Sequence, residues 1–295
     1  MKVLITGGAG FVARHLLVEL ASAGNEVWLS DRLDADLPNY RKADLTNADS
    51  IFRLVDEVRP DAIVHLGAIS FVPDAAKDPA FLKRVNEGGT QNLLKVFVEM
   101  KPPRRLGDMP QFLFISTAQV YMKQPSAYAM SKMSGEALVF HYCHEGVDGV
   151  IARPANHTGP GQSEKFVVPS FIRQALDIKA GRRRCFMVGN LDSVRDFTDV
   201  RDVVRAYRIL LEKGRSTGVY SIGTSEHLSM RELLVKVAKI VGVPADYEVD
   251  PALWRPSDAS PVLDTEAIRK LGWMPRFTLD DTLVDMIAQQ EQLAL

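Results

Sequence analysis

The sequence predicts a doubly wound α/β fold, in which helices cover both faces of a parallel sheet, with a smaller C-terminal lobe. In the first half of the chain, short and continuously apolar runs alternate with helical patterns. This alternation is typical of parallel strands that are buried on both faces. In addition, a glycine-rich turn joins the first apolar run to the first helix, and open parallel sheets bind ligands at such turns.

The elements of the first half follow one another with short connections. Apolar runs rich in β-branched and aromatic residues predict the strands, and longer runs without breakers predict the helices. Strands are expected at 2–6, 26–30, 61–66, 111–116 and 147–153, and helices at 11–23, 49–58, 79–100 and 127–145. The second of these helices ends before Pro60, because a proline disfavours helical geometry in the residue before it.

After Pro154 the alternation becomes less regular. Ser229 and Glu232 predict a capping box at the start of a helix over 229–241. The other expected elements are a loop at 156–162, a helix at 166–180, a segment at 195–202 that leads into a helix through Leu211, a strand at 218–222 and a helix at 279–292. We therefore expect one domain to comprise 1–165 and 194–225, and the smaller lobe to comprise 166–193 and 226–295.

Composition narrows the function classes. The chain has 295 residues, of which 46% are hydrophobic and 25% charged, so it can bury a large core without disulfides. Its two cysteines fit a reducing, cytoplasmic location. A formal charge of −1 argues against a nucleic-acid-binding surface. No apolar run approaches the ~18 residues of a membrane span, and the histidines and cysteines have no metal-ligand spacing.

The glycine-rich turn predicts a dinucleotide site, and with it a Rossmann-type sheet. Gly7 permits a tight turn, Gly10 lets the backbone approach a pyrophosphate, and Ala13 keeps the helix close to the strand. The start of the helix, at Phe11 and Val12, offers N–H groups to the phosphates. A plain turn between two elements is the alternative, but strand, glycines and helix come in the required order.

Asp31, at the end of the second strand, is the candidate for the adenosine ribose. A carboxylate there accepts hydrogen bonds from both ribose hydroxyls and repels a 2′-phosphate, which favours NAD(H). The following Arg32 could pair with a 2′-phosphate, so NADP(H) is the alternative cofactor. Asp31 could instead be a simple turn or helix-capping residue.

Tyr128 and Lys132 are the candidate chemical groups. Four residues apart in a predicted helix, they leave the same face, and an ammonium beside a phenol favours the phenolate. Taken alone, a tyrosine and a lysine at this spacing more often lie on a solvent-exposed helix face and have no chemical role. Here, however, Ser116 and Thr117 end the preceding strand, at the edge of the sheet where this helix starts. Thr117, Tyr128 and Lys132 therefore fit a site for oxidising or reducing a secondary alcohol beside a nicotinamide.

These motifs resemble the extended short-chain dehydrogenase/reductase superfamily, specifically its NAD-dependent nucleotide-sugar epimerase/dehydratase/reductase branch. Further similarity lies at 65–68, 86–94, 153–162, 188–191, 195–202 and 255–257, and is strongest to GDP-4-keto-6-deoxy-D-mannose reductases and GDP-mannose 4,6-dehydratases. The resemblance covers nearly the whole chain and implies a homodimer, formed by pairing the helices expected at 79–100 and 127–145.

The resemblance also implies residue roles. Thr117 would bind the sugar oxygen, Tyr128 would exchange the proton, and Lys132 would hold the nicotinamide ribose. The remaining cofactor contacts would come from Gly7, Gly10, Phe11, Val12, Asp31, Arg32, Asp44, Leu45, Leu66, Gly67 and Ala68, and the remaining substrate contacts from Ser70, Asn86, Asn156, Arg195 and Arg255. Without the resemblance, Arg195 would be read as the partner of Asp196, Asp199 or Asp202, and Arg255 as the partner of Asp258.

The chain departs from the dehydratases at one informative position. Those enzymes carry an acid after the catalytic threonine, whereas Thr117 is followed by Ala118 and Gln119, and an amide is no base near neutral pH. The connection from Tyr121 to Tyr128 is also shorter than in the relatives. The sequence thus predicts an NAD(P)-dependent reductase of a GDP-4-keto-6-deoxyhexose. Alternatives are an NAD-retaining nucleotide-sugar 4-epimerase, which uses the same residues, and a non-catalytic dinucleotide-binding protein.

Overall fold

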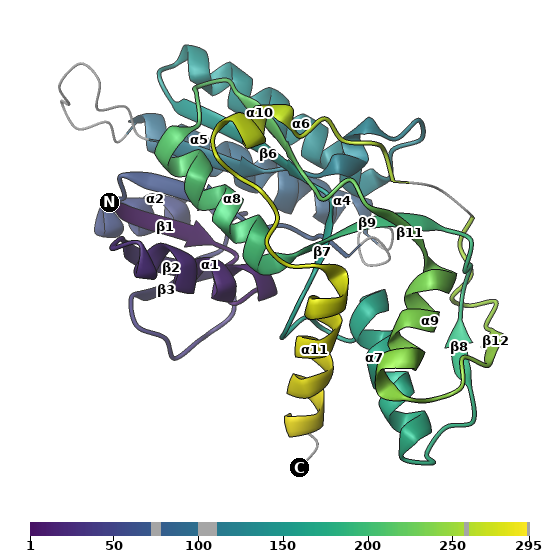
Figure 1. Cartoon of the computed structure of the whole chain (residues 1–295). Helices are drawn as coiled ribbons and strands as arrows, with labels where there is room; N and C mark the ends of the chain where they lie inside the picture. The colour runs from purple at the N-terminus through teal and green to yellow at the C-terminus, as the bar shows by residue number, and fades with distance from the viewer. Residues whose placement is uncertain (72–77, 100–110, 257–259, 294–295) are drawn as a thin grey trace. The chain divides into compact units, whose positions relative to one another are not determined.

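The computed structural model describes residues 1–71, 78–99, 111–256 and 260–293 (Figure 1). They cluster into two compact units. The first unit comprises Met1–Pro154, Val204–Ile222 and Asp264–Trp273, and the second comprises Ala155–Val203, Gly223–Leu263 and Met274–Leu295. Compared with the expected domains, the segments 155–165 and 194–203 group with the second unit, because strands within these two segments pair with each other. The segment 264–273 groups with the first unit.

The first unit is built on a parallel sheet, which confirms the predicted fold class. Its seven strands lie in the order β10 (Val219–Ile222), β6 (Asp148–Pro154), β5 (Gln111–Ile115), β4 (Ala62–His65), β1 (Lys2–Thr6), β2 (Glu26–Asp31) and β3 (Tyr40–Lys42). The apolar residues of the central strands β1, β4 and β5 are buried, as continuous apolar runs require. Strand order reverses direction at β1, where β2 and β4 flank it, so the ends of β1 and β4 border a ligand crevice.

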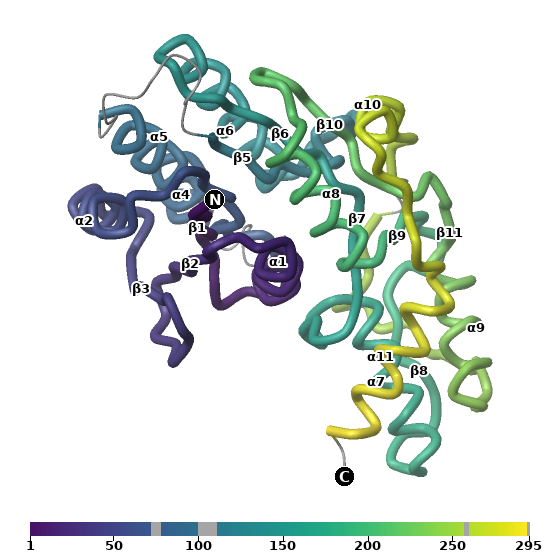
Figure 2. Tube along the Cα trace, turned by 60° about the vertical axis from the view of Figure 1, so that its left-hand side comes forward, coloured from purple at the N-terminus to yellow at the C-terminus, as the bar shows by residue number. Residues whose placement is uncertain are grey.

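Helices cover both faces of this sheet (Figure 2). On one face, the apolar stripes of α2 (Ala48–Val58), α5 (Gly89–Glu99) and α6 (Ala127–His144) share a core with the strands. On the other lie α1 (Phe11–Ser22) and α8 (Val200–Lys213), joined by an ion pair between Glu19 and Arg208. The remaining pieces are α4 (Pro79–Lys83), the π-helix η1 (Arg84–Gly88), the 3-10 helix η2 (Ala118–Tyr121) and α10 (Glu266–Lys270).

Some expected features of these helices are wrong in detail. The helix expected at 79–100 is interrupted by the π-helical η1, and residue 100 lies outside the described residues. Apolar side chains of α5 and α6 pack on the chain's own core, with Leu94 fully buried there. By contrast, Met130 and Met133 on α6 are 57% and 45% exposed.

The second unit combines three helices with short strands. Its core forms where α7 (Val167–Lys179), α9 (Met230–Val241) and α11 (Leu279–Leu293) meet β8 and β9. Its strands are β7 (Asn156–Thr158), β8 (Phe186–Val188), β9 (Val194–Asp199), β11 (His227–Ser229) and β12 (Tyr247–Val249). The predicted capping box at Ser229 and Glu232 is present. The loop expected at 156–162 is wrong in its first part, because β7 pairs there with β9.

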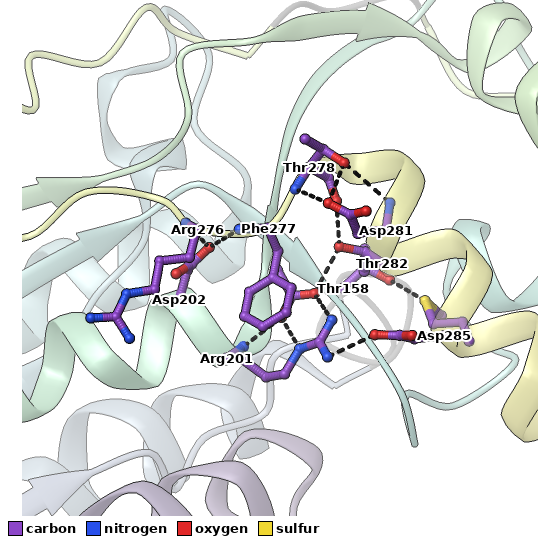
Figure 3. Close-up of polar contacts among 11 residues, drawn as sticks. Thr158, Arg201, Asp202, Arg276, Phe277, Thr278, Asp281, Thr282 and Asp285 are labelled. Carbon is purple, nitrogen blue, oxygen red and sulfur yellow. Dashed lines mark hydrogen bonds and ion pairs between the residues drawn. The ribbon is translucent and has the colours of Figure 1, made fainter.

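Acidic side chains from β9 and α8 hold the second unit together (Figure 3). Asp199 accepts hydrogen bonds from Arg201 and from the hydroxyl of Thr282, the latter at 2.7 Å. Asp202 accepts the backbone N–H groups of residues 276 and 277 at 2.8 and 3.0 Å. Arg201 also pairs with Asp285 on α11, at 2.7 Å. These contacts fix the start of α11 against β9.

Candidate functional site

The glycine turn between β1 and α1 has the tight geometry that the sequence predicted. Gly7 has φ +73°, a left-handed conformation that favours glycine. A Cβ at Gly7 would lie 2.8 Å from the backbone nitrogen of Gly67, so the turn touches the chain that follows β4. Gly10 begins α1 without a side-chain cap, and the first turn of α1 has no acidic residue. The positive end of the helix is thus left for an anion.

A chain of hydrogen bonds behind the turn holds Gly67 in place. The N–H of Gly67 donates to Thr6 Oγ1 at 3.2 Å, and that hydroxyl lies 2.7 Å from His65 Nδ1. His65 Nε2 lies 3.0 Å from Thr90 Oγ1, which donates to the carbonyl of Asn86. Burial, aided by Lys132, lowers the pKa of His65 to about 3, so the ring is neutral. Because the single hydroxyl proton of Thr90 is donated to Asn86, its oxygen must accept from His65, which places the ring proton on Nε2.

The residues expected around the adenosine lie at the ends of β2 and β3. Asp31 Oδ2 accepts the N–H of Ala9 at 3.3 Å, which ties the carboxylate to the glycine turn, while Arg32 is exposed. Leu45 lies against Gly67 and Gly89, since a Cβ on either would be 2.8 Å from its side chain. Asp44 is exposed and accepts two hydrogen bonds from Thr46.

These features fit a dinucleotide. The left-handed Gly7 leaves no room for a side chain, the uncapped start of α1 offers backbone donors to a pyrophosphate, and the Asp31 carboxylate stands beside the turn. Phe11 and Val12 begin the helix and are partly exposed, as are Leu66 and Ala68 after β4. The structure therefore brings the expected cofactor residues of the first unit to the carboxyl edge of the sheet.

The three candidate chemical residues also lie at this edge. Thr117 follows β5, is 7% exposed and accepts the N–H of Gln119 at 3.2 Å; its hydroxyl proton has no acceptor among the described residues. Lys132 is 4% exposed, and its Nζ donates to the carbonyl of Ile115 at 2.7 Å. Tyr128 stands one turn earlier on α6, and its hydroxyl makes no hydrogen bond within the described part of the chain.

Burial determines the protonation states of Tyr128 and Lys132. It raises the pKa of the Tyr128 phenol above its ordinary value, which differs from the expectation that Lys132 would bring it toward neutrality. Burial lowers the pKa of Lys132 to about 8, and the charge of Glu136 opposes that fall. Near neutral pH the site therefore holds a protonated phenol beside a lysine that still carries most of its charge. A protonated phenol is equipped to donate a proton rather than to accept one.

Sequence reasoning missed a buried ion pair next to these residues. Glu136 is 5% exposed and lies four residues after Lys132 on α6. Arg153 of β6 donates to both of its carboxylate oxygens, at 2.9 and 2.5 Å, and Ser116 donates to one of them. Arg153 also donates to the hydroxyl of Tyr121 at 2.9 Å. The sequence did contain a signal for it: Glu136 follows Lys132 by four residues, which places both side chains on the same face of the helix.

Asn86 and Ser70, two of the expected substrate residues in the first unit, differ in their surroundings: Asn86 is buried and bonded, and Ser70 is exposed. The amide of Asn86, within the π-helix, bonds to both backbone groups of Ile69 and to the hydroxyl of Ser131 at 2.9 Å. It therefore ties the chain after β4 to α6. Ser70 is exposed on that same stretch of chain.

The other expected substrate residues belong to the second unit. Asn156 starts β7 and is partly exposed. Arg195 is partly exposed on β9, and its guanidinium donates to the carbonyl of Val194 at 2.9 Å. Arg255 is exposed, and its Nη1 donates to the carbonyls of Ala252 and Trp254. Asp258, the ion-pair partner considered for Arg255, lies outside the described residues.

The three acids that follow Arg195 accept hydrogen bonds from other parts of the second unit. Asp196 accepts the hydroxyl of Thr224 at 2.7 Å and the N–H of Ser225 at 2.9 Å. Asp199 and Asp202 hold the start of α11, as described above. The carboxylates that follow Arg195 thus build the second unit.

Comparison with known proteins gives a family model that matches residues 3–223, described as the NAD dependent epimerase/dehydratase family. A similar curated protein is the GDP-6-deoxy-D-mannose reductase of Pseudomonas aeruginosa. It is 34% identical over 309 residues, with 98% of this chain and 97% of the relative covered.

Two solved structures are similar over 99% of both chains. One is RMD from Pseudomonas aeruginosa complexed with NADPH, with 31% identity and a TM-score of 0.85. The other is UDP-glucose 4-epimerase from Thermus thermophilus in complex with NAD, with 28% identity and a TM-score of 0.84. Within the described residues, no helix is both long and apolar enough to cross a bilayer.

Proposed function

Because the chain belongs to the NAD dependent epimerase/dehydratase family, we propose that it reduces the C4 ketone of a GDP-4-keto-6-deoxyhexose. It is an enzyme of the extended short-chain dehydrogenase/reductase group, and its cofactor is a nicotinamide dinucleotide. The observation that carries the proposal is the similarity to a GDP-6-deoxy-D-mannose reductase, at 34% identity over 98% of this chain.

The bound dinucleotide would supply the hydride that reduces the ketone carbon. The chain's own residues orient the ketone and deliver the proton. Thr117 donates its hydroxyl proton as a hydrogen bond to the ketone oxygen, since the same hydroxyl already accepts from Gln119. Tyr128 then transfers its phenolic proton to that oxygen, which becomes the hydroxyl of the product. The raised pKa of Tyr128 keeps this proton in place until negative charge develops on the oxygen.

Lys132 serves the reaction by its charge. Its ammonium group has three donors, of which one is used on the carbonyl of Ile115. The other two are available to the ribose hydroxyls of the nicotinamide half. The same charge stabilises the tyrosinate that forms as the proton leaves.

Reduction is favoured over dehydration by the residues after Thr117. Ala118 and Gln119 form the first turn of η2, and neither can remove a proton from the carbon next to the ketone. The substrate diphosphate would be bound by Asn156, Arg195 and Arg255 of the second unit, because guanidinium groups form charge-assisted bonds with phosphate oxygens.

For the cofactor we propose a preference for NAD(H), with NADP(H) as the alternative. The carboxylate of Asp31, fixed by Ala9, repels a 2′-phosphate. The same residue supports a second candidate function, a nucleotide-sugar 4-epimerase that retains NAD, since the Thermus thermophilus epimerase was solved with NAD. Mass spectrometry of the denatured protein separates the two: released NAD indicates the epimerase, and an empty protein indicates the reductase.

The direct test is a rate assay with GDP-4-keto-6-deoxymannose and NADH or NADPH. Product formation coupled to dinucleotide oxidation is the expected result. Thr117→Val should lower turnover at least about tenfold without changing dinucleotide affinity, because its hydroxyl is assigned to the sugar oxygen and not to the dinucleotide. No turnover of the wild type with any nucleotide sugar would favour the non-catalytic alternative.

We also propose that the enzyme is a cytoplasmic homodimer formed through α5 and α6. The exposed Met130 and Met133 on α6 support an apolar contact there. Light scattering at micromolar concentration should give twice the monomer mass, and a monomer mass would contradict the proposal.

A further inference from the structure

One buried carboxylate joins the elements that carry the candidate chemical residues. Glu136 belongs to α6, and its oxygens accept hydrogen bonds from Ser116 at the end of β5 and from Arg153 on β6. Thr117 follows Ser116 directly, whereas Lys132 lies one helical turn before Glu136. We propose that Glu136 is a positioning residue, which fixes the face of α6 that carries Lys132 against the end of β5. The catalytic part of this inference rests on the proposed function.

The contact between α6 and β5 is close, so a positioning group there has a strong effect. A Cβ at Gly135 would lie 2.3 Å from the ring of Phe114, and the same ring lies 4.9 Å below Lys132 Nζ. The ammonium group also donates to Ile115. Glycine at position 135 thus lets the helix approach the strand, and the neighbouring Glu136 bonds the two elements at that level.

The charge of Glu136 has a second effect, on Lys132. Burial favours the neutral amine, and the carboxylate one turn away favours the ammonium. The other titratable groups near Lys132 are His65 from β4, which is neutral, and Tyr128, which is protonated. Arg153 from β6 carries the opposite charge and sits on the carboxylate. Glu136 is therefore the acidic group that holds the proton on Lys132.

The ion pair of Glu136 and Arg153 is a poor candidate for a purely stabilising role. Replacing a buried ion pair by apolar residues is often neutral or stabilising, whereas removing one partner leaves a buried charge without compensation. Arg153 further extends the network, because it donates to Tyr121, whose hydroxyl lies 3.1 Å from Ser221 Oγ. The network crosses β5, α6, β6 and β10, and ends beside Thr117.

The test uses Glu136→Gln, which keeps the shape and one acceptor but removes the charge. The amine of Lys132 is titrated in the dinucleotide-free protein by NMR of ¹⁵N-labelled lysine, with Lys132→Met assigning its signal. We expect its titration midpoint to fall by at least about half a pH unit. In rate assays, we expect kcat to fall about tenfold or more, KM for the sugar to stay within about twofold, and the alkaline limb of the kcat profile to move to lower pH.

The matched control is Glu19→Gln. It disrupts another partly buried Glu–Arg pair of the first unit, between Glu19 and Arg208, on the opposite face of the sheet. This variant should lower the melting temperature without moving the Lys132 midpoint or the pH profile. The inference is overturned if Glu136→Gln behaves in the same way, with loss of stability alone.

A second variant covers the case in which Glu136→Gln does not fold. Ser116→Ala keeps the charge pair and removes one hydrogen bond to Glu136. We expect kcat to fall about threefold, the worth of a modest hydrogen bond, with the Lys132 midpoint unchanged; an unchanged kcat would contradict the positioning role. If the wild type turns over no nucleotide sugar, the proposed function fails, while the Lys132 midpoint in Glu136→Gln, or in Glu136→Asp if the former is unfolded, still decides on the charge effect.

Discussion

The candidate site in the first unit has a cofactor end and a chemical end, and the two differ in whether backbone or side chains form them. The cofactor end is formed mainly by backbone and glycines, with Gly7 against Gly67 and a helix start without a side-chain cap, and the Asp31 carboxylate lies beside them. The chemical end consists of side chains, with Lys132 and Glu136 buried together. A substitution in the glycine turn therefore acts through shape, whereas one at Asp31 or at the chemical end acts through charge or proton supply. The predictions below test this separation.

The largest effect is expected at the chemical end. Tyr128→Phe should lower turnover at least ~100-fold, the lower end for the loss of a positioned general acid. Dinucleotide affinity should change little, because the ring is retained and only the hydroxyl is lost. A rate assay with GDP-4-keto-6-deoxymannose, combined with a dinucleotide titration, measures both. Unimpaired turnover would mean that the spacing of Tyr128 and Lys132 is a coincidence.

At the cofactor end, Gly7→Ala should weaken dinucleotide binding about tenfold or more. The new Cβ would meet the chain at Gly67, and the φ of +73° strains any L-residue. Gly24→Ala is the matched control: its φ is +78°, yet no atom lies within 4 Å of the added Cβ. Calorimetric titration should show a loss of affinity in the first variant only. Equal affinities would contradict the role of close backbone approach.

A smaller effect is expected at Asp31. Asp31→Ser removes the repulsion of a 2′-phosphate and leaves Arg32 in place, so the ratio of NADPH to NADH affinity should rise roughly fivefold. Parallel titrations with both dinucleotides measure this ratio. If the wild type already binds NADPH more tightly, then Asp31 does not select the cofactor.

The smallest effect concerns stability as a function of pH. Burial lowers the folded-state pKa of Lys132 to about 8 from an ordinary value of 10.5. Between these two values the unfolded chain binds more protons, so this group makes the free energy of unfolding rise with pH. Urea titrations of the dinucleotide-free protein at pH 7.5–10 should show a shallower rise in Lys132→Met than in the wild type. Parallel curves would mean that Lys132 is not desolvated.

The sequence was most informative where a pattern is local. Strands β1 and β5 and the capping box at Ser229 follow from apolar runs and a four-residue motif, and the structure has all three. The turn at Gly7 could be predicted because strand, glycines and helix are consecutive. The structure thus confirms expectations that depend on neighbouring residues.

Expectations that depend on distant partners fared worse. The three-residue strands β7 and β12 are too short to show periodicity, and they exist through pairing with β9 and β8. The role of Asp196 could not be predicted either, because it holds the chain at Thr224 and Ser225, 28 and 29 residues further on. The pKa of Tyr128 was misjudged for the same reason, because desolvation depends on the packed surroundings.

The hydrogen-bond chain behind the glycine turn has a consequence for how this enzyme can evolve. From Gly67 through Thr6, His65 and Thr90 to Asn86, every proton points the same way along the chain. Replacing one of the three side chains by an apolar one would leave a buried donor or acceptor without a partner. Among homologous sequences, these side chains should consequently be inherited as a set: substitutions at positions 6, 65 and 90 should occur together.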